Sequence, residues 1–264
     1  MTGPMSDVAA LGTVLGVWAH PDDEAYLSGG LMALARDAGS RVVCVTATRG
    51  ELGTPRPEEW PPERLAAARA RELARCLEIL GVGEHHWLGH RDGRCADVPA
   101  AGAVARLCEV VEQVRPDTVL TFGPDGITGH PDHQAVSAWT TAAFERAARP
   151  GARLLYATFA ERRAARWDTL NASLGIFPPG YPVTTPAHRL AVDLVLDAPT
   201  AGRKVRALAA QQTQTAELIA ALGLDLFTAW VRDEAFTERA CVPGEEPPVL
   251  PGRSAGSSPG SNQW

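Results

Sequence analysis

The stretch Thr13–Glu24, TVLGVWAHPDDE, joins a short apolar run to a dense polar cluster. Its apolar part is rich in Val and Leu, which favours a buried strand over Val14–Trp18. Its polar part, His20–Glu24, packs one imidazole and three carboxyl groups into five residues. A second cluster, His130–His133 (HPDH), follows another apolar run at Asp117–Phe122. Imidazole nitrogens and carboxylate oxygens are common ligands of divalent metals, so the two clusters together predict one metal site assembled from distant segments.

The rest of the sequence alternates between strand-like and helix-like segments. Residues Glu63–Leu80 show this clearly, because Leu73, Cys76, Leu77 and Leu80 are spaced as one face of an amphipathic helix. Such alternation predicts an α/β fold with a Rossmann-like, mostly parallel sheet and helices on both faces. Ligands bind at the carboxyl ends of the strands in such folds, so the metal site is expected there. Further strands are expected at Arg41–Thr48, His86–Leu88, Thr118–Phe122 and Arg153–Thr158, and further helices at Tyr26–Ala38, Val98–Val114, Asp132–Ala148 and Arg203–Leu222.

Length and composition suit one catalytic domain. The chain has 264 residues, of which 45% are hydrophobic and 21% charged, as is ordinary for a globular protein with a substantial core. We expect a single domain over residues 12–241, preceded by an N-terminal tail at residues 1–11. Pro, Gly and Ser dominate residues 242–264, which are expected to form a poorly ordered tail. Asn171–Pro186 is rich in turn residues and is expected to be a loop that borders the site.

The net charge and the cysteine pattern exclude several classes of protein. A formal net charge of −6 offers no basic surface for nucleic acid or an anionic membrane. No apolar run approaches the roughly 18 residues of a transmembrane helix, and the N-terminus lacks the pattern of a secretory signal. The five cysteines form no C-x-x-C pair, which argues against a zinc knuckle or a disulfide framework. We therefore expect a reduced, cytoplasmic setting.

The residues by themselves leave the choice of metal ligands open. Two imidazoles and one carboxylate can hold a divalent metal and leave a position for water, as in catalytic zinc sites. A plainer interpretation makes each residue a surface or capping group, with Asp22 and Asp23 at the start of the following helix. Two His-Pro-Asp segments at strand exits favour the metal site. The pattern does not separate Asp22 from Asp23, or His130 from His133.

The motifs Ala19–Glu24 (AHPDDE) and Gly129–His133 (GHPDH) make the chain resemble the LmbE/PIG-L family of zinc-dependent N-deacetylases. Weaker segments occur in the same order as in the family: Thr48–Glu51 (TRGE), a helix that leads into Leu80–Val82 (LGV), and Leu88–Gly93 (LGHRDG). Together these motifs cover roughly the first 150 residues.

The resemblance implies a role for each residue of the two main motifs. His20, Asp23 and His133 would be the ligands of Zn²⁺, with other divalent metals as alternatives. Asp22 would be the general base that takes a proton from the metal-bound water, and His130, as a cation, would stabilise the oxyanion or protonate the leaving amine. The implied reaction removes an acyl group, in the first instance acetyl, from the amide nitrogen of an amino-sugar-containing small molecule or glycoside.

The resemblance also suggests substrate contacts outside these motifs. Arg69 lies on the apolar face of its helix and resembles a substrate-contacting arginine of sugar deacetylases, while Asp92 matches a position that binds a substrate hydroxyl. Arg49 follows a strand and would line the mouth of the pocket. Gln211 stands where many relatives have a histidine, so a cationic role is lost at that position. Thr128 stands where mycothiol-pathway members have a tyrosine, which puts a mycothiol-precursor substrate in doubt.

The sequence leaves two other functions open. Two histidines and one carboxylate also form the iron site of non-haem Fe(II) oxygenases, although the α/β alternation and Asp22 argue against that class. The chain could instead be a metal-stabilised binding module without turnover, against which the intact Asp22 and His130 speak. We expect an N-acyl amino sugar or glycoconjugate as substrate, and no nucleic-acid or membrane partner. Whether the chain forms a homo-oligomer is not decided by these patterns.

Overall fold

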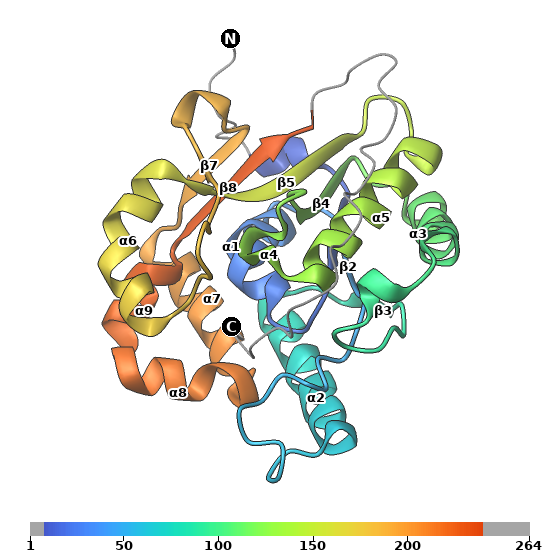
Figure 1. Cartoon of the computed structure of the whole chain (residues 1–264). Helices are drawn as coiled ribbons and strands as arrows, with labels where there is room; N and C mark the ends of the chain where they lie inside the picture. Colours follow the sequence, from blue (N-terminus) through green and yellow to red (C-terminus); the bar gives the residue numbers. More distant parts are fainter. Residues whose placement is uncertain (1–7, 240–264) are drawn as a thin grey trace.

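One mixed sheet organises residues 8–239, which the computed structural model describes. The strands are β1 (Val14–Trp18), β2 (Val42–Thr46), β3 (Glu84–Trp87), β4 (Thr118–Phe122), β5 (Arg153–Ala160), β6 (Thr184–Thr185), β7 (Val192–Val195) and β8 (Asp233–Glu238). They run in the order β3-β2-β1-β4-β5-β8-β7, and β6 pairs with the end of β5 (Figure 1). The strands from β3 to β5 are parallel, whereas β8 is antiparallel to both of its neighbours. The expected mostly parallel sheet is confirmed.

Helices cover both faces of the sheet (Figure 1). The helices are α1 (Asp23–Asp37), α2 (Pro62–Leu80), α3 (Ala100–Val114), α4 (Gly126–Gly129), α5 (Pro131–Ala147), α6 (Glu161–Leu174), α7 (Ala198–Ala209), α8 (Gln212–Leu222) and α9 (Leu224–Val231). Helices α1, α2 and α7 pack together on one face, and α3 packs against α5 on the other. Crossovers between parallel strands are right-handed. From β1 to β3 the chain adds strands at one edge of the sheet, and β4 and β5 are then added on the other side of β1. The connecting helices of the two halves therefore lie on opposite faces.

The strand order reverses between β1 and β4, and this reversal positions the site. Strands β1, β2 and β4 are buried along their whole length, as expected for parallel strands covered on both faces. His20 follows β1, and His130 follows its neighbour β4. The loops that leave β1 and β4 diverge to opposite faces, which opens a crevice at the carboxyl ends of these strands. Both polar clusters therefore start from the same edge of the sheet.

One hydrophobic core extends from Leu11 to Phe236. Leu11 belongs to the segment assigned to an N-terminal tail from the sequence; it lies in a 3-10 turn, η1 (Val8–Leu11), and is fully buried. The C-terminal tail expected at residues 242–264 lies outside the described residues.

The single long helix expected at Arg203–Leu222 is wrong, because α7 and α8 are separate helices that meet at Ala210 and Gln211. Gln211 leaves the helical conformation, with φ −93° and ψ 56°, and is only 1% exposed. Its amide donates to the buried carboxyl group of Glu24 at 2.7 Å. A hydrogen bond across the core thus interrupts a segment of good helix formers. Helix α6 and strands β7 and β8 were not predicted either.

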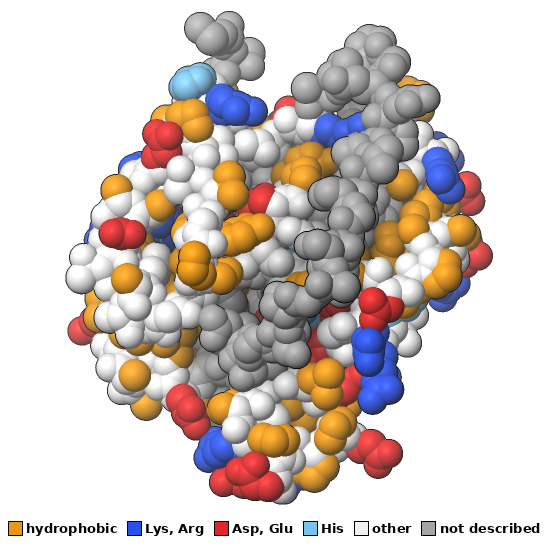
Figure 2. Space-filling view, in the orientation of Figure 1, with side chains coloured by type: hydrophobic (Ala, Val, Ile, Leu, Met, Phe, Trp, Pro, Cys, Tyr) orange, Lys and Arg blue, Asp and Glu red, His pale blue; other side chains and the backbone are white. Residues whose placement is uncertain are grey.

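The exposed face shown in Figure 2 carries acidic and basic side chains interspersed with hydrophobic ones. No large area of one sign is visible on the described part of this face, in keeping with the small net charge of −6. Within residues 8–239, no helix is both long enough and apolar enough to cross a membrane.

Lys204 and Glu234 form a completely buried ion pair that fixes the start of α1. Lys204 Nζ lies 2.7 Å from Glu234 Oε1 and also donates to the Tyr26 carbonyl at 2.7 Å. Glu234 in turn accepts the backbone N–H groups of Gly30 and of the next residue. The ion pair therefore contacts the Tyr26 carbonyl and the Gly30 N–H, which lie one helical turn apart in α1. It thereby ties the half of α1 that carries Asp23 to α7 and β8.

Replacing Lys204 with Met would leave the Glu234 carboxylate buried without its charged partner. We expect Lys204→Met to lower the free energy of unfolding by about 3–5 kcal/mol, measured by equilibrium unfolding in guanidinium chloride. Arg106→Ala is the matched control, because it removes an exposed ion pair with Glu109 and should cost less than about 1 kcal/mol. Equal, small effects of both substitutions would contradict the role given to the buried pair.

Candidate functional site

The two histidine clusters meet at the crevice between β1 and β4. His20 lies in the loop after β1, and Asp23 opens α1. His130 caps α5, and His133 lies in the first turn of that helix. The rings of His20 and His133 have centroids 5.2 Å apart, and the ring of His130 lies 5.0 Å from each of them. The structure therefore brings together side chains that are more than a hundred residues apart in the sequence.

The hydrogen bonds of the two imidazoles leave two nitrogen lone pairs facing each other. His133 Nδ1 lies 2.9 Å from the Gly126 carbonyl, which can only accept, so Nδ1 carries the proton and Nε2 is free. His20 Nε2 faces the carboxylates of Asp92 at 3.1 Å and Asp132 at 3.3 Å, so its proton sits there and Nδ1 is free. His20 Nδ1 and His133 Nε2 lie 3.2 Å apart. A cation between them would satisfy both lone pairs.

Asp23 completes a set of atoms with the spacing of metal ligands. Its two carboxylate oxygens lie 3.6 Å from His20 Nδ1 and 3.4 Å from His133 Nε2. Ligands held about 2.0–2.1 Å from a tetrahedral zinc ion lie about 3.3 Å from one another. The three side chains expected as ligands therefore fit a divalent metal. Burial alone would raise the pKa of Asp23, but its interactions with His133 and His20, which include a hydrogen bond from the His20 backbone, lower it to about 2.

Asp132 is a site residue that the sequence reasoning missed. It is fully buried, and its carboxylate accepts the backbone N–H groups of Gly93 at 2.8 Å and Cys95 at 3.0 Å. These bonds aim the carboxylate at His20, whose orientation and tautomer it fixes. Although burial alone would lower the pKa of His20, the surrounding carboxylates raise it well above the ordinary value. The place of Asp132 between two histidines in HPDH was the signal that could have identified it.

Asp92, like Asp132, faces the Nε2 atom of His20, and it is buried from solvent. It is 5% exposed, and its second oxygen accepts the Leu52 N–H at 2.8 Å. Its own N–H donates to Glu51. The structure thus places Asp92 as an orienting partner of His20, whereas the resemblance suggested a contact with a substrate hydroxyl.

Asp22 is held in a strained conformation beside the ligand set. Its φ of 102° and ψ of −35° are unfavourable for a residue with a side chain, and its carboxylate makes no capping hydrogen bond to α1. Arg69 forms an ion pair with Asp22 at 3.1 Å and also donates to the carbonyls of Pro21 and Gly50. Glu24 accepts the Asp22 N–H at 2.9 Å from the other side. Burial raises the pKa of Asp22 well above its ordinary value, and the charge of Arg69 opposes this rise.

Arg69 is buried to 97%, and both of its terminal nitrogens donate to the protein, whereas its Nε has no hydrogen-bond partner in the described part of the chain. A Cβ atom at Gly50 would lie 2.1 Å from Arg69 Nη1, and Gly50 also has a φ of +62°. The TRGE motif therefore needs glycine so that the loop after β2 can approach this guanidinium. The structure presents Arg69 as a clamp on Asp22 and the neighbouring loops.

His130 is neutral in this arrangement. Its Nδ1 accepts the Asp132 N–H at 3.1 Å, which a doubly protonated ring could not do. Burial and the nearby charges of His20 and His133 lower the pKa of His130 to about 4. Its free nitrogen, Nε2, then carries a proton that can be donated. This differs from the cationic role that the resemblance implies.

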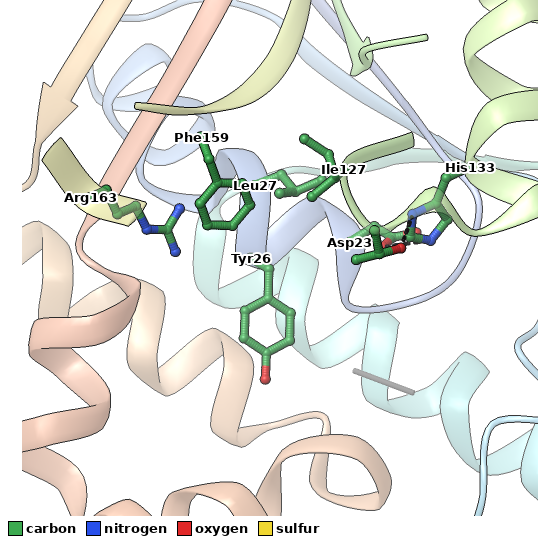
Figure 3. Close-up of a pocket in the computed structure, with 8 residues that line it drawn as sticks. Asp23, Tyr26, Leu27, Ile127, His133, Phe159 and Arg163 are labelled. Atoms are coloured by element: carbon green, nitrogen blue, oxygen red, sulfur yellow. Dashed lines mark hydrogen bonds and ion pairs between the residues drawn. The ribbon is translucent and has the colours of Figure 1, made fainter. Parts of the chain in front are cut away.

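Two hollows border the site. The apolar pocket, a small cavity of about 30 Å³, is lined by Asp23, Tyr26, Leu27, Ile127, Thr128, His133, Phe159 and Arg163 (Figure 3). The polar cleft, about 480 Å³, is lined by side chains that include Arg49, Glu51, Glu63, His90 and Arg91.

Of the two other residues expected to contact substrate, Arg49 lines one of these hollows and Gln211 lines neither. Arg49 lines the polar cleft as expected and stacks over Trp87, with 4.7 Å between the guanidinium carbon and the ring centroid. Gln211 is buried against Glu24, away from both sets of lining residues. The excursion at Asn171–Pro186 borders the site, because a Cβ atom at Gly129 would lie 2.6 Å from the Tyr181 ring.

Comparisons with known proteins agree with this geometry. Residues 15–144 match the family model described as PIG-L, GlcNAc-PI de-N-acetylase. A 1D-myo-inositol 2-acetamido-2-deoxy-alpha-D-glucopyranoside deacetylase of Kineococcus radiotolerans is 42% identical over 168 residues, which cover 53% of this chain and 46% of the relative. The chain thus spans about half the length of several curated relatives that it matches.

Solved structures share the fold. The N,N'-diacetylchitobiose deacetylase from Pyrococcus horikoshii has a TM-score of 0.59 at 20% identity, over 89% of this chain and 87% of that one. A deacetylase of the teicoplanin biosynthesis pathway has a TM-score of 0.61 at 16% identity, over 86% of this chain and 97% of that one.

Asp132→Asn tests the part that Asp132 takes in metal binding. The side-chain amide of asparagine has only one oxygen, so it cannot accept from both backbone N–H groups and from His20 as the carboxylate does. We therefore expect Zn²⁺ affinity to fall about 10–100-fold. Isothermal titration calorimetry on the chelator-treated protein measures this, with circular dichroism to check folding. His188→Ala, at an exposed histidine, is the control. Unchanged affinity in folded Asp132→Asn would show that Asp132 does not orient the ligand.

Proposed function

Because residues 15–144 of this chain belong to the PIG-L family, we propose that the protein is a metal-dependent amidohydrolase that removes an acyl group from an amino-sugar-containing small molecule or glycoside. One observation carries the proposal. The free nitrogens of His20 and His133 face each other at 3.2 Å with Asp23 beside them, and the strained Asp22 is clamped next to this set. We take residues 12–241 as one catalytic domain.

The residues that would hold the metal are His20, Asp23 and His133, and Zn²⁺ is the proposed ion. Two nitrogens and one carboxylate oxygen suit zinc and leave a position for water. A bound divalent cation lowers the pKa of a water ligand and polarises an amide carbonyl. Five buried carboxyl groups surround this place, at Asp22, Asp23, Glu24, Asp92 and Asp132. Such a concentration of acidic groups favours a cation of charge two over a neutral occupant.

Asp22 and His130 would carry out the proton chemistry. Asp22 accepts a proton from the attacking water and returns it to the amine nitrogen as the C–N bond breaks. A carboxyl group whose pKa is raised by burial is suited to both halves of this exchange. Neutral His130 donates its Nε2–H to the oxygen on which negative charge develops. This assignment needs no cationic histidine.

The clamped Asp22 also favours hydrolysis over the alternatives. An Fe(II) oxygenase uses two histidines and one carboxylate without a second carboxyl group held in a strained backbone beside them. Strain of this kind costs about 1–3 kcal/mol and is found where function requires it. A binding module without turnover would have no use for it.

The two hollows suit the two parts of an N-acylated sugar. The polar cleft presents guanidinium, carboxylate and imidazole groups that can bond hydroxyl groups, so we assign it to the sugar. The apolar pocket adjoins Asp23 and His133, so we assign it to the acyl group. The relatives named above act on N-acetylated amino sugars, which supports this class of substrate.

Asp22→Asn should separate catalysis from metal binding. We expect amine release by the zinc-loaded variant to fall by at least about 100-fold, because the proton acceptor is lost. Zn²⁺ affinity should stay within a few-fold of the parent, whereas His20→Ala should lose metal and activity together. The substrates are a panel of N-acylated glucosaminides. Full activity of Asp22→Asn would rule out its role as the base.

Arg69→Met tests whether this arginine positions Asp22 or binds substrate. Loss of the neighbouring cation raises the pKa of Asp22, so the acid limb of the kcat profile should move to higher pH. We expect kcat to fall with little change in KM, and Arg69→Lys to restore part of kcat. An increase in KM with an unshifted pH profile would instead indicate a substrate contact.

A further inference from the structure

Arg163 lines the apolar pocket but has no part in the mechanism above. It lies in the first turn of α6 and is only 8% exposed. Figure 3 shows its guanidinium beside the ring of Phe159, with Phe159, Leu27 and Ile127 between it and the pair Asp23 and His133. The pocket thus has the metal ligands at one end and a buried cation at the other.

The charge of Arg163 is not neutralised by any ion pair within residues 8–239. One nitrogen donates to the Trp230 carbonyl at 3.3 Å, and the guanidinium carbon lies 4.3 Å from the centroid of the Phe159 ring. Nε is buried and lacks a hydrogen-bond partner in the described part of the chain. A guanidinium has five N–H donors, and the Nε–H of Arg163 remains available to an acceptor.

The nearest carboxylates are engaged elsewhere. Asp233 lies 3.7 Å from Arg162, and Glu234 lies 2.7 Å from Lys204. Their charges oppose the effect of burial, which nevertheless lowers the pKa of Arg163 to about 10. The side chain is therefore still charged at neutral pH. A buried charge without a partner is costly, which favours an anion in this pocket.

The walls of the pocket indicate which part of the substrate brings that anion. Tyr26, Leu27, Ile127 and Phe159 present mainly hydrocarbon surface between Arg163 and the ligand set. A sugar would leave its hydroxyl groups unpaired there, whereas an acyl chain would bury its methylene groups favourably. The polar cleft offers the sugar a better place.

We propose that Arg163 binds a carboxylate at the far end of the acyl group, so that the preferred substrates are half-amides of dicarboxylic acids with an amino sugar. This rests on the proposed function. Water adds to the amide carbon, the C–N bond breaks, and the products are the free amine and a dicarboxylate. Arg163 is a specificity-determining residue that leaves the reacting bond untouched.

The test compares matched acyl groups on one sugar with the zinc-loaded full chain. N-succinyl, N-glutaryl and N-adipoyl glucosamine are each paired with an analogue in which an isopropyl group replaces the terminal carboxylate. We expect one chain length to show kcat/KM at least about tenfold higher than its neutral match. Arg163→Met should abolish this ratio, and Arg163→Lys should keep part of it. Arg166→Met, at an exposed arginine of the same helix, should leave it unchanged.

A binding measurement separates this inference from the proposed function. Isothermal titration calorimetry compares glutarate and 5-methylhexanoate on the parent and on Arg163→Met, with thermal unfolding to check that the variant is folded. If no substrate releases amine but glutarate affinity falls about tenfold in Arg163→Met, the anion site stands and the proposed function fails. If acyl groups are released without any preference for a carboxylate, and Arg163→Met changes neither measurement, the anion site is overturned and the function stands.

Discussion

Charge balance in a buried crevice is the constraint on which this structure depends. Five carboxyl groups and two facing imidazoles are buried where β1 and β4 end, and Arg69 forms an ion pair with one of these carboxylates, Asp22. Burial makes unbalanced charge expensive, so the arrangement calls for a divalent ion between His20 and His133. The strained Asp22 persists because Arg69 and Glu24 hold its side chain and backbone from two sides.

The same constraint acts with opposite sign at Arg163. There a cation is buried among hydrocarbon side chains, while its acidic neighbours Asp233 and Glu234 are engaged by Arg162 and Lys204. The crevice between β1 and β4 therefore favours a positive ion, and the far end of the apolar pocket favours a negative one. A bound metal would compensate the buried negative charge of the carboxylates, and an anionic substrate would compensate the buried positive charge of Arg163. Chemistry and specificity then follow from one electrostatic principle.

Much of the fold and the core of the site could be predicted from local patterns. The strand at Thr118–Phe122 and the helix ending at Gly81 follow from runs of apolar residues and from a glycine that adopts a positive φ. The resemblance to the LmbE/PIG-L family is confirmed by the match over residues 15–144. Helix α6 was missed because its arginine-rich sequence is strongly polar and gives few apolar residues to recognise. The break at Gln211 was missed because a distant partner, Glu24, causes it.

The sequence alone determined the residue types of the site, because HPDDE and HPDH place ligand groups next to runs that must become buried strands. Only the tertiary structure decided which atoms do what. The free nitrogen of each imidazole is set by Gly126, Asp92 and Asp132, and the conformation of Asp22 is set by Arg69. Except for Gly126, these partners lie far from their targets along the chain, and hydrogen bonding depends on distance and direction in space. Local patterns can name such groups, but folding gives them their orientation and protonation.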